Sequence, residues 1–452
     1  MTNTDWSRIL AYLPPNATES IVSSQFVEPL LDALGFNDLE RHPQFKTGDG
    51  AKSVDFAARE NSDGDIFLSS PNNPYLLVEV KGRAIASGAT INLAEDTPHY
   101  KKTKHQIQQY LLAPKCKTAQ WGIITNANHI QLFRRHEKVV VPATPNLLIK
   151  ESNINNIISG IKTLLEKPPK ALTVCIYNNK GGVGKTTTTI NLAATFAKLG
   201  KKVLVVDFDP QQKDLTNSLG LQEGIVTLSN CLINPTLSVR KAIQPFQVQY
   251  KCGNKVKFDV IPSDSNLDAL SHITTSIQKR AARLRDLLKP LVNDYDYILI
   301  DCPANWMFFS QSSVYSADVI LIPTKHNSLT SLENAAKVIK HFIPQVKNQR
   351  GDGGPVALPI FFNGEKITDP QIEAVNTAIY KLIITIKRTK NFDLLPYYWP
   401  KYCTGDKNQT IFSIPGYAIV SNSVFYRVPA ALKDITAYKY YHKLIEEYFC
   451  HG

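Results

Sequence analysis

A glycine-rich loop between two apolar segments constrains this chain more than any other part of its sequence. Ala171 to Ile176 is an apolar run that predicts a buried strand, and the apolar spacing of Ile190 to Leu199 predicts a helix. The loop between them is Tyr177-Asn-Asn-Lys-Gly-Gly-Val-Gly-Lys-Thr-Thr-Thr-Thr189. A strand, a glycine turn and a helix N-terminus together form a cradle in which backbone N–H groups face phosphate oxygens. The sequence therefore predicts a phosphate-binding loop.

The side chains of this loop suit a polyphosphate. Glycines let the backbone approach the phosphates, Lys185 supplies a point charge, and the hydroxyl of Thr186 suits Mg²⁺ coordination. Lys180 is a second cation, which is surplus for holding one nucleotide and is therefore predicted to act across an interface. The predicted phosphate-binding residues are Gly181, Gly182, Val183, Gly184, Lys185, Thr186 and Thr187.

This loop resembles the deviant P-loop of the ParA/MinD family of dimerising ATPases, in which the first lysine reaches the nucleotide of the partner subunit. The resemblance runs from about residue 172 to the C-terminus. It implies a ParA-like P-loop NTPase domain with a mostly parallel sheet and helices on both faces, ATP and Mg²⁺ as cofactors, and an ATP-dependent homodimer. The further segments that carry the resemblance are Lys202 to Gln211, Tyr297 to Pro303, Ala317 to Pro323 and Phe361 to Asn363.

Acidic residues follow two of the predicted parallel strands, at the edge where ligands of open α/β sheets bind. By the resemblance, Asp209 orients or activates the attacking water, and Asp207 and Asp301 hold Mg²⁺ through its waters. The same resemblance places Asn363 against the adenine. The alternative is that the aspartates only cap the helices that follow the strands.

The resemblance assigns catalysis of ATP hydrolysis to Lys180, Lys185 and Asp209. The chain departs from the family pattern in two places. Gln212 to Thr216 stands where a Gly-Asn or Ala-Asn pair is typical, and Ala304 to Trp306 stands where many members have a second proline. Neither departure removes a predicted phosphate or metal ligand, but both bear on the rate of hydrolysis and on how a partner stimulates it.

Charge and cysteine usage bound the class of protein. The formal net charge is +12, which favours a polyanionic partner, DNA first, over a generally basic solvated surface. No apolar run approaches the ~20 residues that span a bilayer, and the first residues lack the order of a signal peptide. The cysteines form no CxxC pair and no metal-ligand spacing. We therefore expect a cytoplasmic protein with no membrane partner.

A proline pair divides the chain. Glu151 to Glu166 has apolar residues at helical spacing and predicts an amphipathic helix, and Lys167-Pro-Pro-Lys170 then ends it. We therefore predict a first domain over residues 1–166, a linker over 167–171 and a second domain over 172–452.

A second group of chemistry-bearing residues lies in the first domain. Ser53 to Ala57 and Pro74 to Lys81 predict neighbouring strands, and Asp55 lies on the first of them. Strand alternation places Glu79 and Lys81 on the same face of the second. An acid and a lysine at the end of an apolar strand are unfavourable in a core, but they suit a metal ion and a water molecule.

This order resembles the PD-(D/E)xK nuclease fold, especially the N-terminal nuclease domain of type I restriction enzyme R subunits, over roughly residues 15 to 165. It implies a restriction-endonuclease-like α/β domain in which Asp55 and Glu79 bind Mg²⁺ and Lys81 positions or activates water. Gln106 and Tyr110, one turn apart on a predicted helix, would support the site or contact DNA. The segments that also carry the resemblance are Phe26 to Leu31, Leu34 to Phe36, Trp121 to Asn126 and His129 to Phe133.

The resemblance adds Glu28 as a possible extra acid. A retained but inactive DNA-binding fold is the alternative to an active nuclease. Several basic residues are candidates to line a track for DNA phosphates, and a solvated basic face is the alternative for each. These residues are Lys101, Lys102, Lys104, Lys115, Lys117, Arg134 and Arg135.

Two functions follow from these motifs. In the first, ATP drives dimerisation through Lys180 and brings two nuclease sites together on DNA, in defence against foreign DNA or in control of mobile elements. In the second, the chain is a plasmid or chromosome partition ATPase whose first domain is a non-catalytic DNA or partner adaptor. A ParB-like or other activating protein is then expected, with Lys387, Arg388 and Lys390 as candidate DNA contacts. A third function, that of a metabolic P-loop enzyme acting on a small molecule, is disfavoured because the sequence shows no site for an acceptor molecule.

Overall fold

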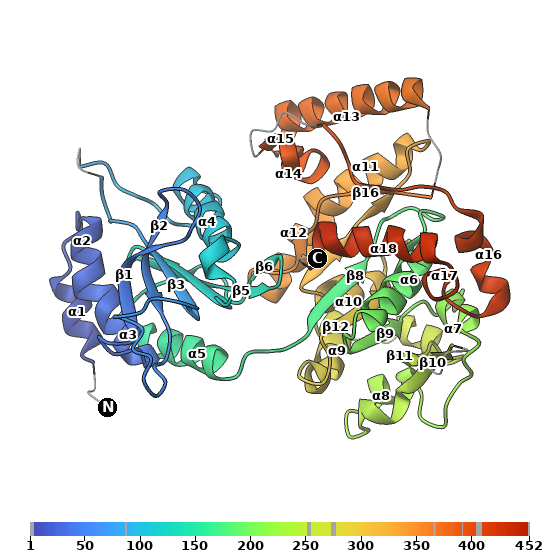
Figure 1. Cartoon of the computed structure of the whole chain (residues 1–452), viewed down its shortest axis with the longest axis horizontal. Helices are drawn as coiled ribbons and strands as arrows, with labels where there is room; N and C mark the ends of the chain where they lie inside the picture. The colour runs from blue at the N-terminus through green and yellow to red at the C-terminus, as the bar shows by residue number, and fades with distance from the viewer. Residues whose placement is uncertain are drawn as a thin grey trace. The chain divides into compact units, whose positions relative to one another are not determined.

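The computed structural model describes residues 4–85, 88–250, 255–272, 277–364, 368–390, 392–403 and 409–450 (Figure 1). The chain forms two compact units. The first unit holds residues 1–169 with the short stretch 351–353, and the second holds residues 170–350 and 354–452. The division at 169/170 lies inside the linker that the proline pair predicts.

The first unit is built on a mixed sheet with the order β1-β2-β3-β4-β5-β6, and β7 also pairs with β5. Neighbouring strands are antiparallel except β3 and β4, which are parallel. The strands are β1 (Arg41–Lys46), β2 (Ser53–Ala58), β3 (Leu76–Val80), β4 (Trp121–Thr125), β5 (His129–His136), β6 (Val139–Pro142) and β7 (Leu147–Leu148). The helices are α1 (Trp6–Tyr12), α2 (Glu19–Val22), α3 (Glu28–Leu34), α4 (Pro98–Leu111) and α5 (Ile154–Glu166), with a π turn over Ser23–Val27 and a 3-10 turn over Pro114–Cys116.

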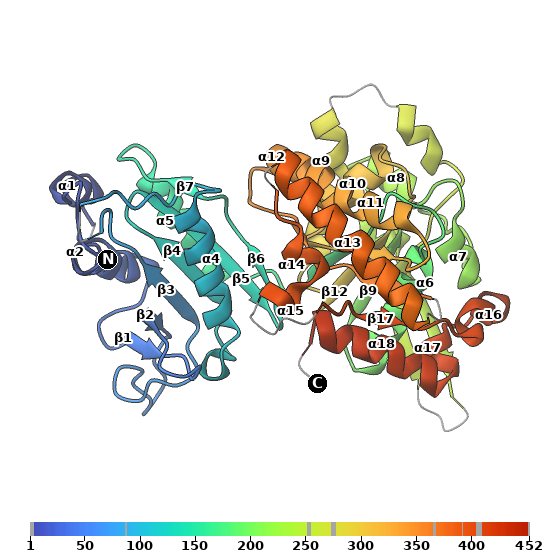
Figure 2. The ribbon, with the colours of Figure 1, turned by 90° about the horizontal axis from the view of Figure 1, so that it is seen from above.

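Strand alternation divides the core of this unit between the two faces of the sheet. Val78 and Val80 of β3 pack on one face with side chains of α1, α3 and α5. Leu77 lies on the other face, which α4 covers (Figure 2). Glu79 follows Leu77 with a period of two, so it points to the α4 face of the sheet. Gly122 of β4 permits the close approach, because a Cβ there would lie 2.8 Å from Ile107 Cγ1 of α4.

The second unit is built on a larger sheet with the order β10-β11-β9-β12-β8-β13-β15, parallel except at the β10–β11 edge. A smaller parallel sheet has the order β14-β16-β17. The strands are β8 (Leu172–Ile176), β9 (Val203–Asp207), β10 (Gln244–Gln249), β11 (Lys255–Ile261), β12 (Tyr297–Asp301), β13 (Val319–Leu321), β14 (Pro323–Thr324), β15 (Val356–Ala357), β16 (Phe361–Asn363) and β17 (Ser413–Ile414).

Helices cover both faces of the larger sheet. On one face, Ile298 and Ile300 of β12 join a large apolar core with side chains of α8 to α11. On the other face, Tyr297 stacks on Phe196 of α6 with ring centroids 3.9 Å apart, and α18 packs on α6. The helices are α6 (Lys185–Lys198), α7 (Asp214–Ser218), α8 (Leu228–Ile233), α9 (Ile277–Leu288), α10 (Phe308–Ser316), α11 (Leu329–Lys337), α12 (Ile343–Arg350), α13 (Asp369–Lys390), α14 (Leu395–Tyr398), α15 (Pro400–Cys403), α16 (Ala418–Tyr426), α17 (Ala430–Lys433) and α18 (Ile435–Tyr448).

Shorter turns complete the unit, with 3-10 turns over Val239–Ala242, Leu267–His272 and Lys289–Leu291 and a π turn over Val338–Phe342. Among the described residues, no helix has the length and apolar character needed to cross a lipid bilayer. Helix α6 begins at Lys185, five residues before the apolar spacing that predicted it, because its first turn is made of threonines.

Candidate functional sites

The glycine loop lies between the end of β8 and the start of α6. Gly182 and Gly184 have φ angles of +72° and +85°, the left-handed region that glycine enters without strain. Gly184 is also the N-cap of α6. The loop therefore turns directly into a helix N-terminus, where unpaired N–H groups and the helix dipole favour an anion. This strand, glycine turn and helix N-terminus have the form that the sequence predicts for a phosphate-binding loop.

The two lysines of the loop have different surroundings. The Lys185 ammonium curls back and donates to the Lys180 carbonyl at 3.4 Å, so its charge stays at the mouth of the loop. The Lys180 side chain is exposed to solvent. An exposed cation at the rim of a phosphate site can reach a second molecule, whereas Lys185 is placed to serve its own loop.

Two carboxylates meet behind the loop. Asp207 and Asp301 end adjacent parallel strands and are register partners. Burial first, and then the Asp207 charge, raise the pKa of Asp301 to about 8, although a hydrogen bond from the Thr186 hydroxyl lowers it. Burial likewise raises the pKa of Asp207 to about 6. Two such acids side by side disfavour their charged forms unless a cation joins them.

The structure distinguishes these two aspartates, which the sequence treats alike. Both oxygens of Asp207 accept protein hydrogen bonds, from Asp209 N at 3.2 Å and from the Thr216 N and Oγ1 at 2.9 and 2.6 Å. Asp301 Oδ1 is buried and has no hydrogen-bond partner among the described residues. The hydroxyl of Thr186 lies beside it. Asp301 and Thr186 thus fit Mg²⁺ best, because a free carboxylate oxygen and a hydroxyl are ligands of this ion.

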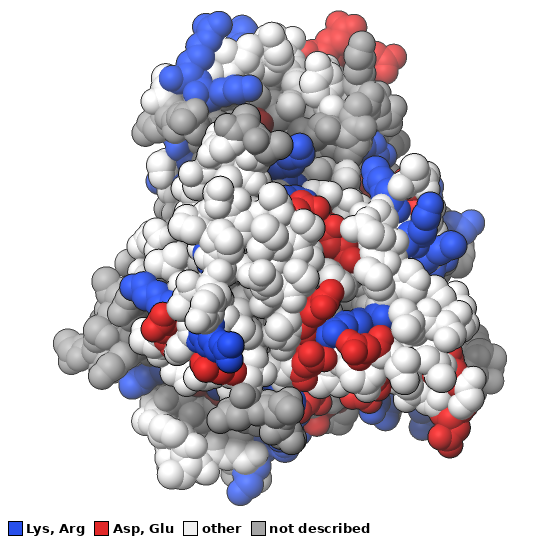
Figure 3. Space-filling model, turned by 90° about the vertical axis from the view of Figure 1, so that its left-hand side faces the viewer, with Lys and Arg blue, Asp and Glu red and all other residues white. Residues whose placement is uncertain are grey.

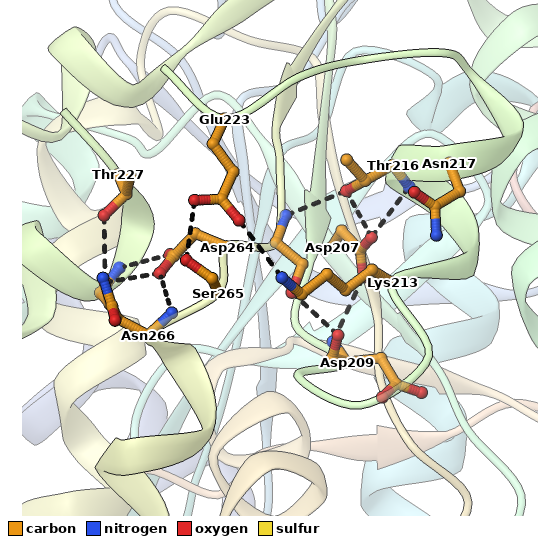
Figure 4. A network of polar contacts seen from close by, with 12 residues as sticks. Asp207, Asp209, Lys213, Thr216, Asn217, Glu223, Thr227, Asp264, Ser265 and Asn266 are labelled. Carbon is orange, nitrogen blue, oxygen red and sulfur yellow. Dashed lines mark hydrogen bonds and ion pairs between the residues drawn. The ribbon is translucent and has the colours of Figure 1, made fainter. Parts of the chain in front are cut away.

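Asp209 belongs to a polar network that links the end of β9 to α8 (Figure 4). Its Oδ1 accepts the N–H groups of Gln211 and Gln212 at 3.1 and 3.2 Å. Its carbonyl accepts the Ser263 hydroxyl at 2.8 Å. This arrangement fixes the turn after β9, so the capping alternative holds for one oxygen of Asp209. Its side chain is half-buried, and a role toward water stays a prediction.

The same network continues through charged residues to the start of α8. Lys213 and Glu223 form an ion pair at 3.3 Å, and the Ser265 hydroxyl donates to Glu223 at 3.0 Å. Asp264 then accepts the N–H and hydroxyl of Ser229 in the first turn of α8, at 2.9 and 2.6 Å. The turn that carries Asp209 is therefore tied to a helix outside the phosphate site.

An aromatic group lies in the segment after β12. Trp306 stacks on Phe342 with ring centroids 4.1 Å apart, and its ring centroid lies 5.7 Å from that of Tyr177. The Tyr177 hydroxyl donates to Asn179 Oδ1 at 3.0 Å and to the Asn305 carbonyl at 3.2 Å. The segment after β12 is thus packed against the first residues of the glycine-rich loop.

Asn363 lies at the end of β16, against the phosphate loop. Its amide donates to the Val183 carbonyl at 3.0 Å and to Thr188 Oγ1 at 3.2 Å. A Cβ on Gly184 would collide with this amide. In this structure Asn363 therefore braces the loop, and its contact with adenine stays a prediction.

In the first unit, the predicted acidic residues converge at the end of β3. Asp55 Oδ2 accepts the Val80 N–H at 2.7 Å, which joins β2 to β3 at this point. Glu79 is 1% exposed, and Lys81 Nζ lies 2.5 Å from its Oε1. Burial, followed by the Asp55 charge, raises the pKa of Glu79 to about 8, although Lys81 lowers it. For Lys81, burial acts to lower the pKa, but the charge of Glu79 outweighs it and the pKa is raised.

Helix α4 brings the predicted glutamine and tyrosine to the same cluster. Gln106 Nε2 donates to the Tyr110 hydroxyl at 2.8 Å. Burial raises the pKa of Tyr110, with smaller effects from the charges of Glu79, Lys81 and Asp55. Gln106 and Tyr110 are thus joined to each other on α4, and a role for either toward Asp55, Glu79 and Lys81 stays a prediction.

The structure adds one acid that the sequence reasoning missed. Glu19, at the start of α2, has an Oε2 3.7 Å from Lys81 Nζ. Burial raises the pKa of Glu19, and both Lys81 and Asp55 affect it. Glu28, the acid that the resemblance suggested, opens α3, and no described interaction of Asp55 or Lys81 involves it. No motif marks Glu19, because only the fold brings α2 to the end of β3.

The predicted Mg²⁺ in the first unit fits this donor set in part. Glu79 Oε2 is buried without a hydrogen-bond partner among the described residues, so one carboxylate oxygen is available beside Asp55. Across the described parts of both units, no group of three or more His, Cys, Asp or Glu side chains is placed to hold a metal ion. A cation at either site would therefore complete its shell with phosphate oxygens and water, as Mg²⁺ commonly does.

The predicted phosphate track needs a correction at its two arginines. Arg134 is 5% exposed and donates to the Pro169 carbonyl at 2.6 Å. Arg135 donates to the carbonyls of Cys116 and Lys117 at 2.9 and 2.7 Å. Both side chains therefore hold backbone carbonyls in place rather than face DNA.

The lysines of the proposed track and of the second unit remain candidates. Lys101, Lys102, Lys115 and Lys117 are exposed, as are Lys387 and Arg388 of α13, and Lys104 is half-buried. The side chain of Lys390 lies outside the described part of the structure. On the face shown in Figure 3, the described Lys and Arg side chains are interspersed with Asp and Glu rather than gathered in one patch.

A comparison with protein families finds a match within the second unit. Residues 171–350 match the family described as AAA domain. The chain is 29% identical to the chromosome partitioning protein ParA of Myxococcus xanthus over 228 residues, 49% of this chain and 76% of that protein. It is 34% identical to the sporulation initiation inhibitor protein Soj of Bacillus subtilis over 152 residues, 34% of this chain and 57% of Soj. The chain thus spans only about half the length of several curated relatives, including two from Mycobacterium tuberculosis at 47%.

Solved structures are also similar to part of the chain. The McdA–ATP complex from Cyanothece aligns at 20% identity with a TM-score of 0.46, over 63% of this chain and 98% of that chain. MinD from Pyrococcus horikoshii with Mg-ADP aligns at 21% identity with a TM-score of 0.43, over 61% of this chain and 95% of that chain.

Proposed function

We propose that this chain is an ATPase that binds ATP with Mg²⁺, pairs with a second copy and hydrolyses the nucleotide. The match of residues 171–350 to the family described as AAA domain and the similarity to ParA and Soj support the proposal. The observation that carries the proposal is the convergence behind one glycine loop of Lys185, Thr186 and the unpartnered oxygen of Asp301. The phosphates would lie against Lys185, and Mg²⁺ would bind the Thr186 hydroxyl and the Asp301 carboxylate.

The residues divide the work by their positions. The α6 N-terminus and Lys185 would neutralise the phosphates, and Thr186 and Asp301 would hold Mg²⁺, which spreads the negative charge of the transferring phosphoryl group. Asp209 would orient the attacking water with its second oxygen, because its first oxygen holds the turn after β9. Lys180 would cross to the nucleotide of a second copy, which the exposure of its side chain supports.

Sedimentation of the full chain with and without ATP tests this proposal. We expect a nucleotide-dependent dimer in the wild type, and a chain that binds ATP but stays monomeric in Lys180→Ala. Lys185→Ala is the matched control, since it removes a charge from the same loop but is expected to abolish binding itself. A Lys180→Ala chain that dimerises and hydrolyses ATP as the wild type does would refute the role of Lys180.

We further propose that the first unit is a metal-dependent DNA nuclease, used in defence against foreign DNA or in control of mobile elements in the cytoplasm. The supporting observation is that Asp55, Glu79 and Lys81, which the sequence singled out together, form one cluster. A hydrolytic phosphodiester reaction needs a cation to stabilise charge on the phosphate and to lower the pKa of a water molecule. Asp55 and the free oxygen of Glu79 would hold that cation.

Nicking of supercoiled plasmid DNA with Mg²⁺ or Mn²⁺, with and without ATP, tests the nuclease. We expect cleavage by the wild type and its loss in Glu79→Gln and Asp55→Asn, both of which keep the side-chain volume. Glu28→Gln serves as the control because it changes an acid outside the cluster. Undiminished cleavage by Glu79→Gln would show that the activity does not arise at this site.

A second candidate function is DNA partitioning, in which the first unit is an adaptor. The curated relatives named as chromosome partitioning proteins favour it. An ATPase of this kind would bind DNA and a ParB-like or other activating protein. ATP hydrolysis that DNA stimulates, that survives Asp55→Asn and that leaves the DNA intact would favour this candidate over the nuclease.

A further inference from the structure

Lys81 lies between two carboxylates that belong to different elements. Its Nζ is 2.5 Å from Glu79 Oε1, at the end of β3, and 3.7 Å from Glu19 Oε2, at the start of α2. The Glu79 side chain is buried, whereas the Glu19 side chain is 49% exposed. One ammonium group therefore has a close partner inside the fold and a second, more solvated partner at the rim.

The inner carboxylate is only half satisfied by this ion pair. Glu79 Oε2 is buried and has no hydrogen-bond partner among the described residues. The neighbouring Asp55 has both oxygens engaged, by Val80 N at 2.7 Å and by Gln44 Nε2 at 3.1 Å. A free buried carboxylate oxygen beside a second carboxylate is a place for a hard cation with oxygen ligands.

A divalent cation at Glu79 would, however, compete with the ammonium already there. Like charges a few ångströms apart repel strongly where the surroundings are of low dielectric constant. Lys81 must therefore leave Glu79, at least in part, when a cation arrives. Glu19 is the nearest carboxylate that can take the ammonium, and a shift of Lys81 toward it needs no backbone movement.

The backbone around Lys81 holds Glu19 in this position. The Arg83 N–H donates to the Ala17 carbonyl at 2.8 Å, and the Arg83 guanidinium donates to the carbonyls of Leu13 at 2.9 Å and Ala127 at 3.2 Å. A Cβ at Gly82 would lie 3.0 Å from both Ala17 O and Glu19 N. The segment that leads into α2 is thus clamped against the residues that follow β3.

We propose that Glu19 is a positioning residue that receives the Lys81 ammonium when a divalent cation binds at Asp55 and Glu79. The inference rests on the proposed nuclease site, whose cation it concerns, but it assigns to Glu19 an indirect role through Lys81. Exchange of one partner for another keeps Lys81 charged and paired in both states. It also moves the ammonium from the buried carboxylate of Glu79 toward the more exposed carboxylate of Glu19.

Binding of Mn²⁺ to the full chain without nucleotide, followed by electron paramagnetic resonance, tests the proposal. Only the Mn²⁺ binding that Glu79→Gln removes is assigned to this site, so Mn²⁺ bound at the phosphate loop is excluded from the comparison. We expect Glu19→Gln to weaken binding at that site by about three- to tenfold, the scale of one partly buried charge pair. Glu28→Gln, which removes an acid in the first turn of the next helix, should leave it unchanged.

A double-mutant cycle separates the indirect role from a direct one. In a Lys81→Met background the ammonium is gone, and Glu19→Gln should no longer change Mn²⁺ affinity. Lys81→Gln repeats the test if the methionine variant does not fold. An equal loss of Mn²⁺ affinity from Glu19→Gln with and without Lys81 would overturn the proposal, because Glu19 would then act on the cation itself. The absence of any loss in both backgrounds would overturn it as well. If no Mn²⁺ binding depends on Glu79, the nuclease site itself fails.

Discussion

Asp301 and Glu79 share an unusual state, since each is a buried carboxyl whose pKa is raised to about 8. Burial is the first cause in both, and a neighbouring aspartate is the second. Each also keeps one oxygen without a hydrogen-bond partner among the described residues. Such groups destabilise a folded chain near neutral pH, and they persist where a ligand compensates. The two proposed cation sites, in two different sheets, thus share a buried carboxyl group with a raised pKa and one unpaired oxygen among the described residues.

The pH dependence of stability follows for Asp301→Asn. Between the ordinary value of 3.8 and about 8, the unfolded chain has released the proton that the folded chain keeps, so wild-type stability falls as pH rises. Without nucleotide, the variant should unfold near the wild-type temperature at pH 4 and at a higher temperature than the wild type at pH 8. The gain in the free energy of unfolding at pH 8 should be a few kcal/mol at most. Calorimetry over this range measures it.

Asp296→Asn is the control with the opposite sign. Burial acts to raise the pKa of Asp296, but the Lys202 N–H and Lys170 lower it overall. Its stabilising effect is present above its ordinary pKa and is lost as pH falls, so this variant should be destabilised at pH 7. An Asp301→Asn chain that is less stable than the wild type at pH 8 would contradict the burial argument.

Gly82 should resist substitution for a steric reason. In Gly82→Ala the new Cβ meets backbone atoms of Ala17, Glu19 and Ala84 at 2.9–3.0 Å, and backbone yields less easily than a side chain. We expect a loss of about 1–3 kcal/mol, seen as a lower unfolding temperature. Gly160→Ala is the control, because a Cβ at this exposed position of α5 meets nothing within 4 Å and should stabilise the helix by ~0.5–1 kcal/mol. Equal stability of the two variants would argue against the clamp.

At the scale of elements, α7 is a short helix held by one buried acid. Thr216 of α7 donates its N–H and its hydroxyl to Asp207 at the end of β9, and the hydroxyl also accepts the Ser263 N–H at 3.0 Å. A five-residue helix has little stability of its own, so this anchor determines its position. The anchor also sets the direction of the turn that carries Asp209.

Thr216→Val should therefore loosen α7. The change keeps the side-chain shape but removes the hydroxyl, at a cost of about 1–3 kcal/mol for the buried groups left without it. Hydrogen exchange of the α7 amides should become faster, with slower ATP hydrolysis as the functional consequence. Thr216→Ser keeps the hydroxyl and should retain protection; equal loosening in the serine variant would mean that packing of the methyl group is the cause.

The elements most accurately predicted from sequence are those with a strong local pattern. The apolar runs at β8, β9 and β12 and the alternation along β3 each fix which face or edge a side chain occupies. The start of α6 was missed because threonines carry no apolar spacing. Glu19 was missed because it reaches Lys81 through tertiary contacts between α2 and the end of β3. Arg134 and Arg135 were misassigned because charge alone does not show that a guanidinium is used to hold carbonyls.

At the scale of the molecule, two compact units share a chain of net charge +12. Each unit has a pair of adjacent exposed cations on a helix, Lys101 and Lys102 on α4 and Lys387 and Arg388 on α13. Either pair is suited to DNA phosphates, and the proposed functions differ in which unit must contact DNA. The pairs therefore offer a way to locate the contact.

The affinity of the ATP-bound chain for duplex DNA should fall steeply with added salt, because Lys and Arg side chains that contact phosphates release counterions from the DNA. Replacing one pair by alanine should reduce the slope of log K against log[salt] by about two if both residues contact phosphates. Fluorescence anisotropy over a salt series measures this for each pair, with the other pair as control. Affinity that does not depend on salt would contradict an electrostatic contact.

The stacking of Trp306 on Phe342 beside Tyr177 has a practical consequence. The Trp306 indole is half-buried and packs near Tyr177, the first residue of the glycine-rich loop. We therefore expect a conformational change in that loop to alter the polarity around the indole ring. Its emission colour should therefore follow nucleotide arrival and departure in real time. The unlabelled chain would then carry its own optical probe in the segment after β12.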